Sequence, residues 1–511
     1  MPAHYIYYHH CSCRSTASSF RRAPRTHPRT AKYKPRCTRA AVRPLPSSAH
    51  AHARLDNPHR RARSSRSIIP MSPVRITDST YVGVPETAAP PPGPIRFTAM
   101  EALWVVFPVL QHVLLYEGDD DMPPFDAILE SLRSSLAATL GSFAPLAGKL
   151  VHLEETGDVG ISCSASDGVR FVVAECDADI RRLAGDEEHD LRVLEALVPE
   201  VDMGRLPTAL LAVQATRFEG GVAVGLTVHH GAADGRALWT FVEAWATACR
   251  GETPATTPCF DRSLVKMPAG DELARSVLRK FAPNLPSAAL ASSVFEDRKR
   301  LTRRTFTLDQ GDIQRLKLRI VHLNESGGTP LPRPPSAFAA VVALAWTCFA
   351  RCKSFSLDDD VWLFFFADIR ERLDPPVGAG YIGSCLTKCL ARLPARELHG
   401  ERALAAAASA VQDEINKMKE DPIAGWNFFS FDPMPAMDRL MNISGSSGFS
   451  AYKIADFGWG KPTRTEPIRM NTDGQVALMG SRDDRGVQVS VALLQAAQMD
   501  EFKSNFLALL E

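Results

Sequence analysis

The stretch Val222-Ala-Val-Gly-Leu-Thr-Val-His-His-Gly-Ala-Ala-Asp-Gly-Arg236 runs from apolar residues into two histidines, an aspartate and a glycine. Its opening apolar run predicts a buried strand, because a short run bounded by a turn is typical of one. Residues 236–249 predict a helix, since their apolar side chains recur at helical spacing. Gly235 lies at the break and suits a tight strand-to-helix turn.

His230 is the candidate general base in this stretch, because histidine has the ordinary side-chain pKa nearest to neutral. Asp234 follows four residues later, so a histidine at the end of a buried strand is joined to a carboxylate in the next turn. The alternative is a buried, hydrogen-bonded histidine without a chemical role. The same spacing recurs at His52 and Asp56 without a strand before it, so spacing alone does not decide.

The composition predicts a globular protein of two domains with an acidic body. The chain has 511 residues, 45% apolar and 23% charged, which is too long for one ordinary core. Residues 1–70 hold 15 Lys and Arg and one acid, Asp56, a charge of +14; since the whole chain carries +1, the remainder carries −13. An acidic body argues against a nucleic-acid partner.

Residues 1–70 are predicted to be a disordered basic extension, because they lack apolar periodicity and are rich in Arg, Ser, Pro and His. Such a composition is typical of a transit peptide or of a segment that binds polyanions. A third interpretation is that the extension is not translated and that Met71 is the protein's own start. No apolar run reaches transmembrane length, so no membrane partner is expected.

The 11 cysteines predict reduced thiols in a cytoplasmic protein rather than a disulfide framework. Cys11 with Cys13, and Cys385 with Cys389, are close pairs, but neither has a second pair with His at metal-ligand spacing. We therefore expect no metal site.

From Met71 onward, strand-like and helix-like segments alternate, which predicts a mixed α/β fold. Strands are expected at residues 102–107, 111–116, 169–174, 222–228, 304–308, 361–366 and 487–491, and helices at residues 126–143, 236–249, 312–319, 338–352 and 499–510. Residues 251–300 show no strong period, which favours a crossover between two halves. The predicted N-terminal domain is 71–265, the crossover segment 266–300 and the C-terminal domain 301–511.

A second motif, more than two hundred residues beyond His230, consists of Asp456, Phe457, Gly458, Trp459 and Gly460. Its glycines favour an irregular loop and its aromatic side chains favour an anchor, so the bland interpretation is a structural turn. Together, His230-x-x-x-Asp234-Gly235 and Asp456-Phe-Gly-Trp-Gly460 resemble the plant BAHD acyl-CoA-dependent acyltransferases, in the family's order and spacing. Supporting pieces are Leu103-Trp-Val-Val-Phe107, Phe143-Ala-Pro-Leu-Ala-Gly-Lys149 and Asp368-x-Arg370-x-Arg372.

The resemblance implies two chloramphenicol-acetyltransferase-like domains with an active-site channel at their interface, an acyl-CoA as co-substrate, and no bound metal or prosthetic group. It implies that His230 is the base and that Asp234 points away from the substrate and pairs with an arginine. Arg303, Arg304 and Arg370 are the candidates for that arginine. It also implies that Trp459 lies near the channel in a mostly structural loop, and that His229 packs rather than reacts.

The stretch Tyr381-Ile-Gly-Ser-Cys385 resembles the Tyr-Phe-Gly-Asn-Cys box of relatives that acylate anthocyanins and other phenolic glucosides, often with malonyl-CoA, and differs from it at Ile382 and Ser384. A malonyl donor carries a carboxylate, whose burial needs a cation. Arg236 is the candidate partner, and an exposed first-turn residue is the alternative. Gly445-Ser-Ser-Gly-Phe449 departs from the family's usual Gly-Ser-Pro-Arg-Phe.

The leading hypothesis is a monomeric enzyme that moves malonyl from malonyl-CoA to a sugar hydroxyl of a flavonoid, an anthocyanin or another phenolic glucoside. The nearest alternative is a hydroxycinnamoyl-CoA O- or N-acyltransferase of the same family. A hypothesis from another class is an inactive relative that only binds, which the paired His230 and Asp234 disfavour. The hypothesis of a nucleic-acid-binding or organelle-targeted protein depends wholly on residues 1–70.

Overall fold

The structure, a computed structural model, describes residues 73–511 except 89, 119–121, 186–187, 289–297, 299, 329–332, 428–429, 431–432 and 434. The predictions for residues 1–70 and for a start at Met71 therefore lie outside the described residues. From Ile69 to Glu511 the chain forms one compact unit.

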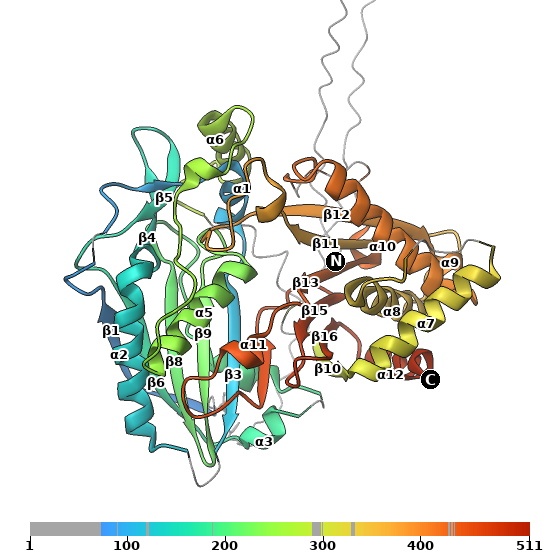
Figure 1. Cartoon of the computed structure of the whole chain (residues 1–511), viewed down its shortest axis with the longest axis horizontal. Coiled ribbons are helices and arrows are strands. Elements are labelled where there is room, and N and C mark those ends of the chain that lie inside the picture. Colours follow the sequence, from blue (N-terminus) through green and yellow to red (C-terminus); the bar gives the residue numbers. More distant parts are fainter. Residues whose placement is uncertain are drawn as a thin grey trace, which may run out of the picture. The chain divides into compact units, whose positions relative to one another are not determined.

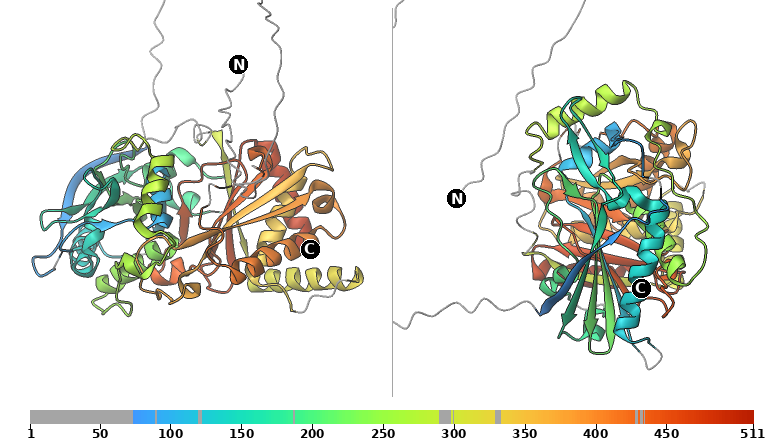
Figure 2. Two further views of the ribbon diagram at one scale, coloured as in Figure 1. Left: turned by 90° about the horizontal axis from the view of Figure 1, so that it is seen from above. Right: turned by 90° about the vertical axis from the view of Figure 1, so that its left-hand side faces the viewer.

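Within the described residues, the first large sheet has six strands in the order β1-β6-β8-β9-β3-β14. Their bounds are Val74–Gly83 (β1), Gly168–Cys176 (β6), Leu211–Phe218 (β8), Gly221–Val228 (β9), Leu110–Glu117 (β3) and Arg464–Pro467 (β14). The strand β9 lies between β8 and β3 and is buried along its whole length, which explains its unbroken apolar sequence. Helices α2 (Phe125–Phe143) and α5 (Gly235–Cys249) pack together, and both lie along this sheet in Figures 1 and 2.

The second large sheet also has six described strands, in the order β10-β16-β15-β13-β11-β12. Their bounds are Thr302–Leu308 (β10), Val487–Leu493 (β16), Gln475–Gly480 (β15), Leu440–Gly445 (β13), Asp360–Asp368 (β11) and Leu386–Pro394 (β12). The helix α8 (Ala337–Arg351) is buried on nearly all sides, because α7 (Gln310–Ser326), α10 (Ala403–Glu420) and α12 (Ala496–Leu510) pack around it, as Figure 1 shows.

The two halves are linked by strand exchange. The strand β14, from the C-terminal half of the sequence, pairs antiparallel with β3 in the first sheet. A small third sheet has the order β2-β5-β4-β7, with bounds Ile95–Arg96, Asp158–Ser162, Lys149–Leu153 and Thr208–Ala209. The remaining described helices are α1 (Ala99–Ala102), α3 (Ile180–Leu183), α4 (Leu191–Ala196), α6 (Gly270–Phe281), α9 (Ala395–His399), α11 (Ala451–Ile454) and the 3₁₀ turns η1 (Leu103–Val106), η2 (Ala144–Ala147), η3 (Arg262–Leu264), η5 (Arg370–Arg372) and η6 (Met437–Arg439).

The prediction of a strand at residues 102–107 is wrong, because α1 ends at Ala102 and η1 follows. Thr98 caps α1, and its backbone N–H donates to Glu101 at 2.9 Å, which completes a capping box. The side chains of η1 are all buried, so the segment shows no helical period. A short apolar run of this kind fits either a strand or a buried helical turn.

Residues 251–300, whose sequence shows no strong period, contain a helix that was not predicted. The amphipathic helix α6 lies there, with Ala274, Val277 and Leu278 buried and a charged outer face. Because α6 has few apolar positions among many charged ones, its sequence shows only a weak helical period. The predicted helix at 312–319 is longer than expected, since α7 runs from Gln310 to Ser326. None of the described helices is long and apolar enough to cross a membrane.

Candidate active site

His230 lies in the tight turn that leaves the buried strand β9. The turn begins where the His229 N–H donates to the Leu210 carbonyl at 2.8 Å, and it closes where the Ala232 N–H donates to the His229 carbonyl at 2.9 Å. Ser384, from the loop before β12, donates its hydroxyl to the His230 carbonyl at 3.1 Å. Both halves of the molecule therefore hold the backbone that carries this histidine.

The ring of His230 is half-buried and stacks on Trp104 of η1. The ring centroids are 3.6 Å apart and the planes are within 2° of parallel. Burial, opposed by the histidine's own backbone carbonyl and by Asp234, lowers the pKa of His230 from 6.5 to about 4. The imidazole is therefore neutral at physiological pH, which is the state a general base needs.

His229 has a different environment from its neighbour. It is 1% exposed, and its Nδ1 accepts a hydrogen bond from the Gly231 N–H at 3.1 Å. Burial and the nearby His230 lower its pKa to about 3. The ring is thus a neutral side chain that shapes the turn, which favours the packing role.

Asp234 is fully buried and uses both carboxylate oxygens within the protein. It caps α5 by accepting the Ala237 N–H at 3.0 Å, and it accepts the Cys385 N–H at 3.1 Å. Arg370 binds it bidentately, at 2.8 and 2.9 Å. Burial alone raises the pKa of such a carboxyl, but Arg370 and the two N–H donors outweigh it and hold the pKa of Asp234 below its ordinary value.

Of the three candidate arginines, Arg370 is the one that binds Asp234 in the structure. Arg303 binds Glu466 and Arg304 binds Asp500, whereas Arg370 reaches Asp234 and also donates to the Gly383 carbonyl at 2.8 Å. Because Asp234 caps α5 and Arg370 is the first residue of η5, this buried pair joins the two halves beside His230.

Glycine is favoured at position 235 for a reason that the sequence did not indicate. Gly235 is the first residue of α5, and it is not among the residues with positive φ. A Cβ atom at this position would lie 3.0 Å from the ring of Phe449. The close approach of Phe449 therefore favours glycine here, and conformational freedom is not needed.

Arg236 is the second residue of α5 and forms an ion pair with Asp368 of β11, at 3.1 Å. Its side chain is 36% exposed. Asp368 also binds Arg370, at 3.1 Å, so Arg236 lies at one end of a row of alternating charges that leads to Asp234. This pairing gives Arg236 a local partner that the sequence had not suggested.

The loop of the second motif packs against the first half rather than reaching His230. Asp456 accepts the N–H groups of Gly458 and Gly460 at 2.9 and 3.1 Å, which closes the loop on itself. Phe457 is 1% exposed and meets the edge of Trp245 in α5, with centroids 4.9 Å apart. Trp459 is half-buried and stacks on Phe457 at 5.6 Å. These contacts anchor the loop.

A second arginine pair was missed by the sequence analysis. Arg262 of η3 binds Glu101 of α1 at 2.9 Å and donates to the Ile382 carbonyl at 2.6 Å, and both side chains are buried. The Tyr381 ring lies 5.4 Å from this guanidinium and 5.6 Å from that of Arg370. Thr98-x-x-Glu101 was the available signal, since the spacing is that of a capping box.

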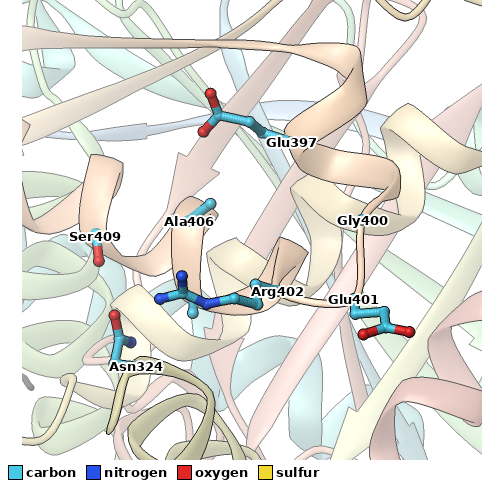
Figure 3. A pocket seen from close by; sticks show the side chains of 8 residues that line it. Asn324, Glu397, Gly400, Glu401, Arg402, Ala406 and Ser409 are labelled. Carbon is cyan, nitrogen blue, oxygen red and sulfur yellow. The ribbon is translucent and has the colours of Figure 1, made fainter. Parts of the chain in front are cut away.

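Two surface hollows of the second half lie outside this cluster. One, of about 690 Å³, is lined by Asn324 of α7, Glu397 of α9, Ser409 of α10 and Arg402, which directly precedes α10, as Figure 3 shows. The other, of about 910 Å³, lies between β10, α7 and α12. Of the residues considered for the site, only Arg304 lines either hollow, and it lies in the second, where it binds Asp500 and not Asp234. Among the described residues, no three His, Cys, Asp or Glu side chains are arranged to hold a metal ion.

A neutral histidine at the end of a central buried strand, between two linked α/β halves, is an arrangement that suits acyl transfer. A family model described as "Transferase family" matches residues 104–509. The chain therefore belongs to the Transferase family, that of the BAHD acyltransferases, and is an acyltransferase with acyl-CoA as co-substrate. The family prediction is confirmed.

Three curated relatives from Arabidopsis thaliana illustrate the similarity. Phenolic glucoside malonyltransferase 2 is 30% identical over 81% of this chain and 93% of its own length. Malonyl-CoA:anthocyanidin 5-O-glucoside-6''-O-malonyltransferase is 29% identical, with the same coverages of 81% and 93%. Agmatine coumaroyltransferase is 26% identical, over 83% of this chain and 96% of its own.

Two solved structures share the fold. Vinorine synthase has a TM-score of 0.64 at 21% identity and covers 85% of this chain and 98% of its own. The F. graminearum TRI101 protein complexed with coenzyme A and T-2 mycotoxin has a TM-score of 0.61 at 16% identity, covering 80% and 97%. The predicted mixed α/β fold of two chloramphenicol-acetyltransferase-like domains is confirmed.

The rate of acyl transfer is expected to fall near pH 4, and not near pH 6.5, as the pH is lowered. Protonation removes a general base, and burial holds the pKa of His230 at about 4, so kcat/KM should stay level from about pH 8 to about pH 5 and fall about tenfold per unit below the pKa. Initial rates across this range provide the measurement. An acid limb centred near pH 6.5 would show that the base has an ordinary pKa.

The control for that profile is recovery of activity on return to neutral pH. Burial lowers the pKa of His229 to about 3 and of His112 to about 4. Histidines in the unfolded chain bind protons near pH 6.5, so the unfolded state takes up more protons than the native state as the pH falls below that value. The contribution of these buried histidines to the free energy of unfolding is therefore full above pH 6.5 and declines below it. Activity that does not return at neutral pH is lost by unfolding, whereas activity that returns was lost by protonation of His230.

Proposed function

We propose that this acyltransferase moves malonyl from malonyl-CoA to a sugar hydroxyl of a flavonoid, an anthocyanin or another phenolic glucoside, with His230 as general base. The observation that carries this proposal is the half-buried, neutral His230 at the end of β9, beside an Asp234 engaged by Arg370. The relatives named as malonyltransferases of phenolic and anthocyanidin glucosides support the choice of substrates.

The proposed reaction uses His230 twice, first as a neutral imidazole that accepts a proton and then as an imidazolium that returns it. As the acceptor oxygen attacks the thioester carbonyl, its proton passes to His230 Nε2, and the new C–O bond gives a tetrahedral oxyanion. Nε2 is the assigned atom because Nδ1 is buried and has no hydrogen-bond partner outside its own residue among the described residues. The intermediate collapses with cleavage of the C–S bond, and the thiolate of CoA takes the proton back from His230.

Asp234 has a positioning role in this proposal, because both of its oxygens are bound to Arg370 and to backbone N–H groups. It shapes the turn, and it differs in this from the aspartate of a serine-protease triad, which binds the histidine. Gly235 admits Phe449, and residues 456–460 hold the wall of a channel between domains 71–265 and 301–511. We also propose that the enzyme works as a cytoplasmic monomer, and the free thiols of the described cysteines are consistent with that compartment.

We further propose Arg236 as the partner of the malonyl carboxylate. Its side chain is 36% exposed on the helix that follows His230, and its ion pair with Asp368 uses Nη1. Replacement of Arg236 by Gln should raise KM for malonyl-CoA about tenfold, the usual scale for one charge-assisted hydrogen bond, and should leave KM for acetyl-CoA unchanged. Arg304→Gln is the matched control, because Arg304 pairs with Asp500 on the surface. Equal effects on both donors would exclude this role.

The substrate proposal is tested by comparing donors. The full chain is incubated with one flavonoid glucoside and either malonyl-CoA or coumaroyl-CoA, and CoA release is followed. The malonyl reaction is expected to be the faster. Turnover with coumaroyl-CoA alone would favour the hydroxycinnamoyl alternative, which the coumaroyltransferase relative supports. No acceptor-dependent release with any acyl-CoA would favour an inactive binding relative.

A further inference from the structure

The orientation of the His230 ring lacks the usual explanation. In a His–Asp pair of the triad kind, the carboxylate binds one ring nitrogen and fixes the plane of the imidazole. Here the carboxylate of Asp234 is bound to Arg370, Ala237 and Cys385. The Nδ1 atom of His230 is buried, and no other described residue hydrogen-bonds to it. Its own backbone carbonyl is the polar group that faces it, so a further constraint on the ring plane must come from a contact with the ring face.

Trp104 lies where it can fix the plane of the His230 ring. Its indole lies flat on the imidazole, with 3.6 Å between centroids and 2° between planes, which is full face-to-face contact. Most aromatic pairs prefer an offset or edge-on arrangement, so a parallel stack at this distance marks a ring that its surroundings hold in place. Trp104 is 4% exposed, and the ring centroids of Phe107, which is edge-on, and of Phe366, which is tilted, each lie 5.4 Å from its own.

The backbone under Trp104 is fixed from several sides. The capping box of Thr98 and Glu101 starts the helical turn directly before it. Glu101 binds Arg262, which also donates to the Ile382 carbonyl in the loop that carries Ser384. Ser384 in turn donates to the His230 carbonyl. One chain of contacts therefore sets the positions of both stacked rings.

We propose that Trp104 is a positioning residue for the base, which holds the imidazole plane by stacking and stabilises the imidazolium that forms as His230 takes the acceptor's proton. A π face attracts a cation much more strongly than a neutral ring, particularly where water is excluded. The stack is therefore stronger in the transition state than in the resting enzyme, and an interaction of that kind raises kcat without changing substrate binding. This inference rests on the proposed role of His230 as base.

The test compares Trp104→Phe with Trp104→Leu, using malonyl-CoA and a flavonoid glucoside as substrates of the full chain. The leucine variant should lose about 10- to 30-fold in kcat, the phenylalanine variant less, and both should keep KM within about twofold. Trp104→Met replaces the leucine variant if that variant does not fold. Trp346→Phe is the matched control, since Trp346 is also buried, in α8, and the kcat of this variant per folded molecule should be unchanged.

Three results would overturn the inference: a kcat of the leucine variant within twofold of the parent, a loss confined to KM, or equal losses in the phenylalanine and leucine variants, which would indicate packing alone. His230→Ala is measured in parallel. If that variant stays active, the role of His230 as base fails first. If it is inactive while Trp104→Leu is fully active, only the role of Trp104 fails.

Discussion

Replacement of His230 by Ala is expected to lower kcat for acyl transfer by about 100- to 10,000-fold while the fold stays intact. This is the usual contribution of a positioned general base. The side chain is half-buried and no other described residue hydrogen-bonds to its Nδ1, so its removal should cost only the stack on Trp104 and leave the fold in place. The measurement is the rate of acceptor-dependent CoA release, with circular dichroism and the unfolding midpoint as checks on the fold.

The neighbouring histidine supplies the matched control. Asn at position 229 keeps an acceptor where His229 Nδ1 now accepts the Gly231 N–H. His229→Asn should therefore change kcat by less than about tenfold, and its main effect should be a lower free energy of unfolding. The assignment of the base fails if His230→Ala is nearly as active as the parent, or if His229→Asn alone abolishes turnover.

Replacement of Arg370 by Met is expected to lower the free energy of unfolding by about 3–5 kcal/mol, the usual cost of removing one partner of a buried ion pair. The substitution leaves the carboxylate of Asp234 fully buried without its counter-charge, and it removes a donor to the Gly383 carbonyl. Because the pair joins η5 to the first turn of α5, the turn that carries His230 should also move, and kcat should fall. Urea unfolding measures the first effect.

A double-mutant cycle isolates the pair itself. Asp234→Leu should cost a similar amount plus about 1 kcal/mol for the lost cap of α5, whereas the double variant should cost at least about 2 kcal/mol less than the sum, because no unpaired charge remains. Arg304→Met breaks an exposed pair with Asp500 and should cost at most about 1 kcal/mol. Additive losses at Asp234 and Arg370 would mean that the two side chains are not coupled.

The stretch around His230 was predictable because each part has a local cause. Residues 222–228 are apolar without a break, as a strand buried on both faces must be, and residues 236–249 show the period of a helix packed on one side. The pairing of Asp234 could be narrowed to three arginines but not decided, because 136 residues separate Asp234 from Arg370 and only folding brings them together.

The parts that escaped prediction depend on contacts between distant segments. Trp104 belongs to an apolar run that fits a strand as well as a helical turn, and nothing local indicates that its indole faces His230. The link from Arg262 to Glu101 joins a segment without strong periodicity to a capping box whose spacing was visible at Thr98. Gly235 suggested a turn through backbone freedom, whereas in the structure glycine is favoured by the close approach of the Phe449 ring.

The central claim is that this chain transfers malonyl from malonyl-CoA to a phenolic glucoside by means of His230. The most direct measurement is the mass of the glucoside after incubation with malonyl-CoA and either the full chain or its His230→Ala variant. The account predicts a product heavier by one malonyl group with the parent protein and unchanged glucoside with the variant. Unchanged glucoside with both proteins, or equal product with both, would contradict it.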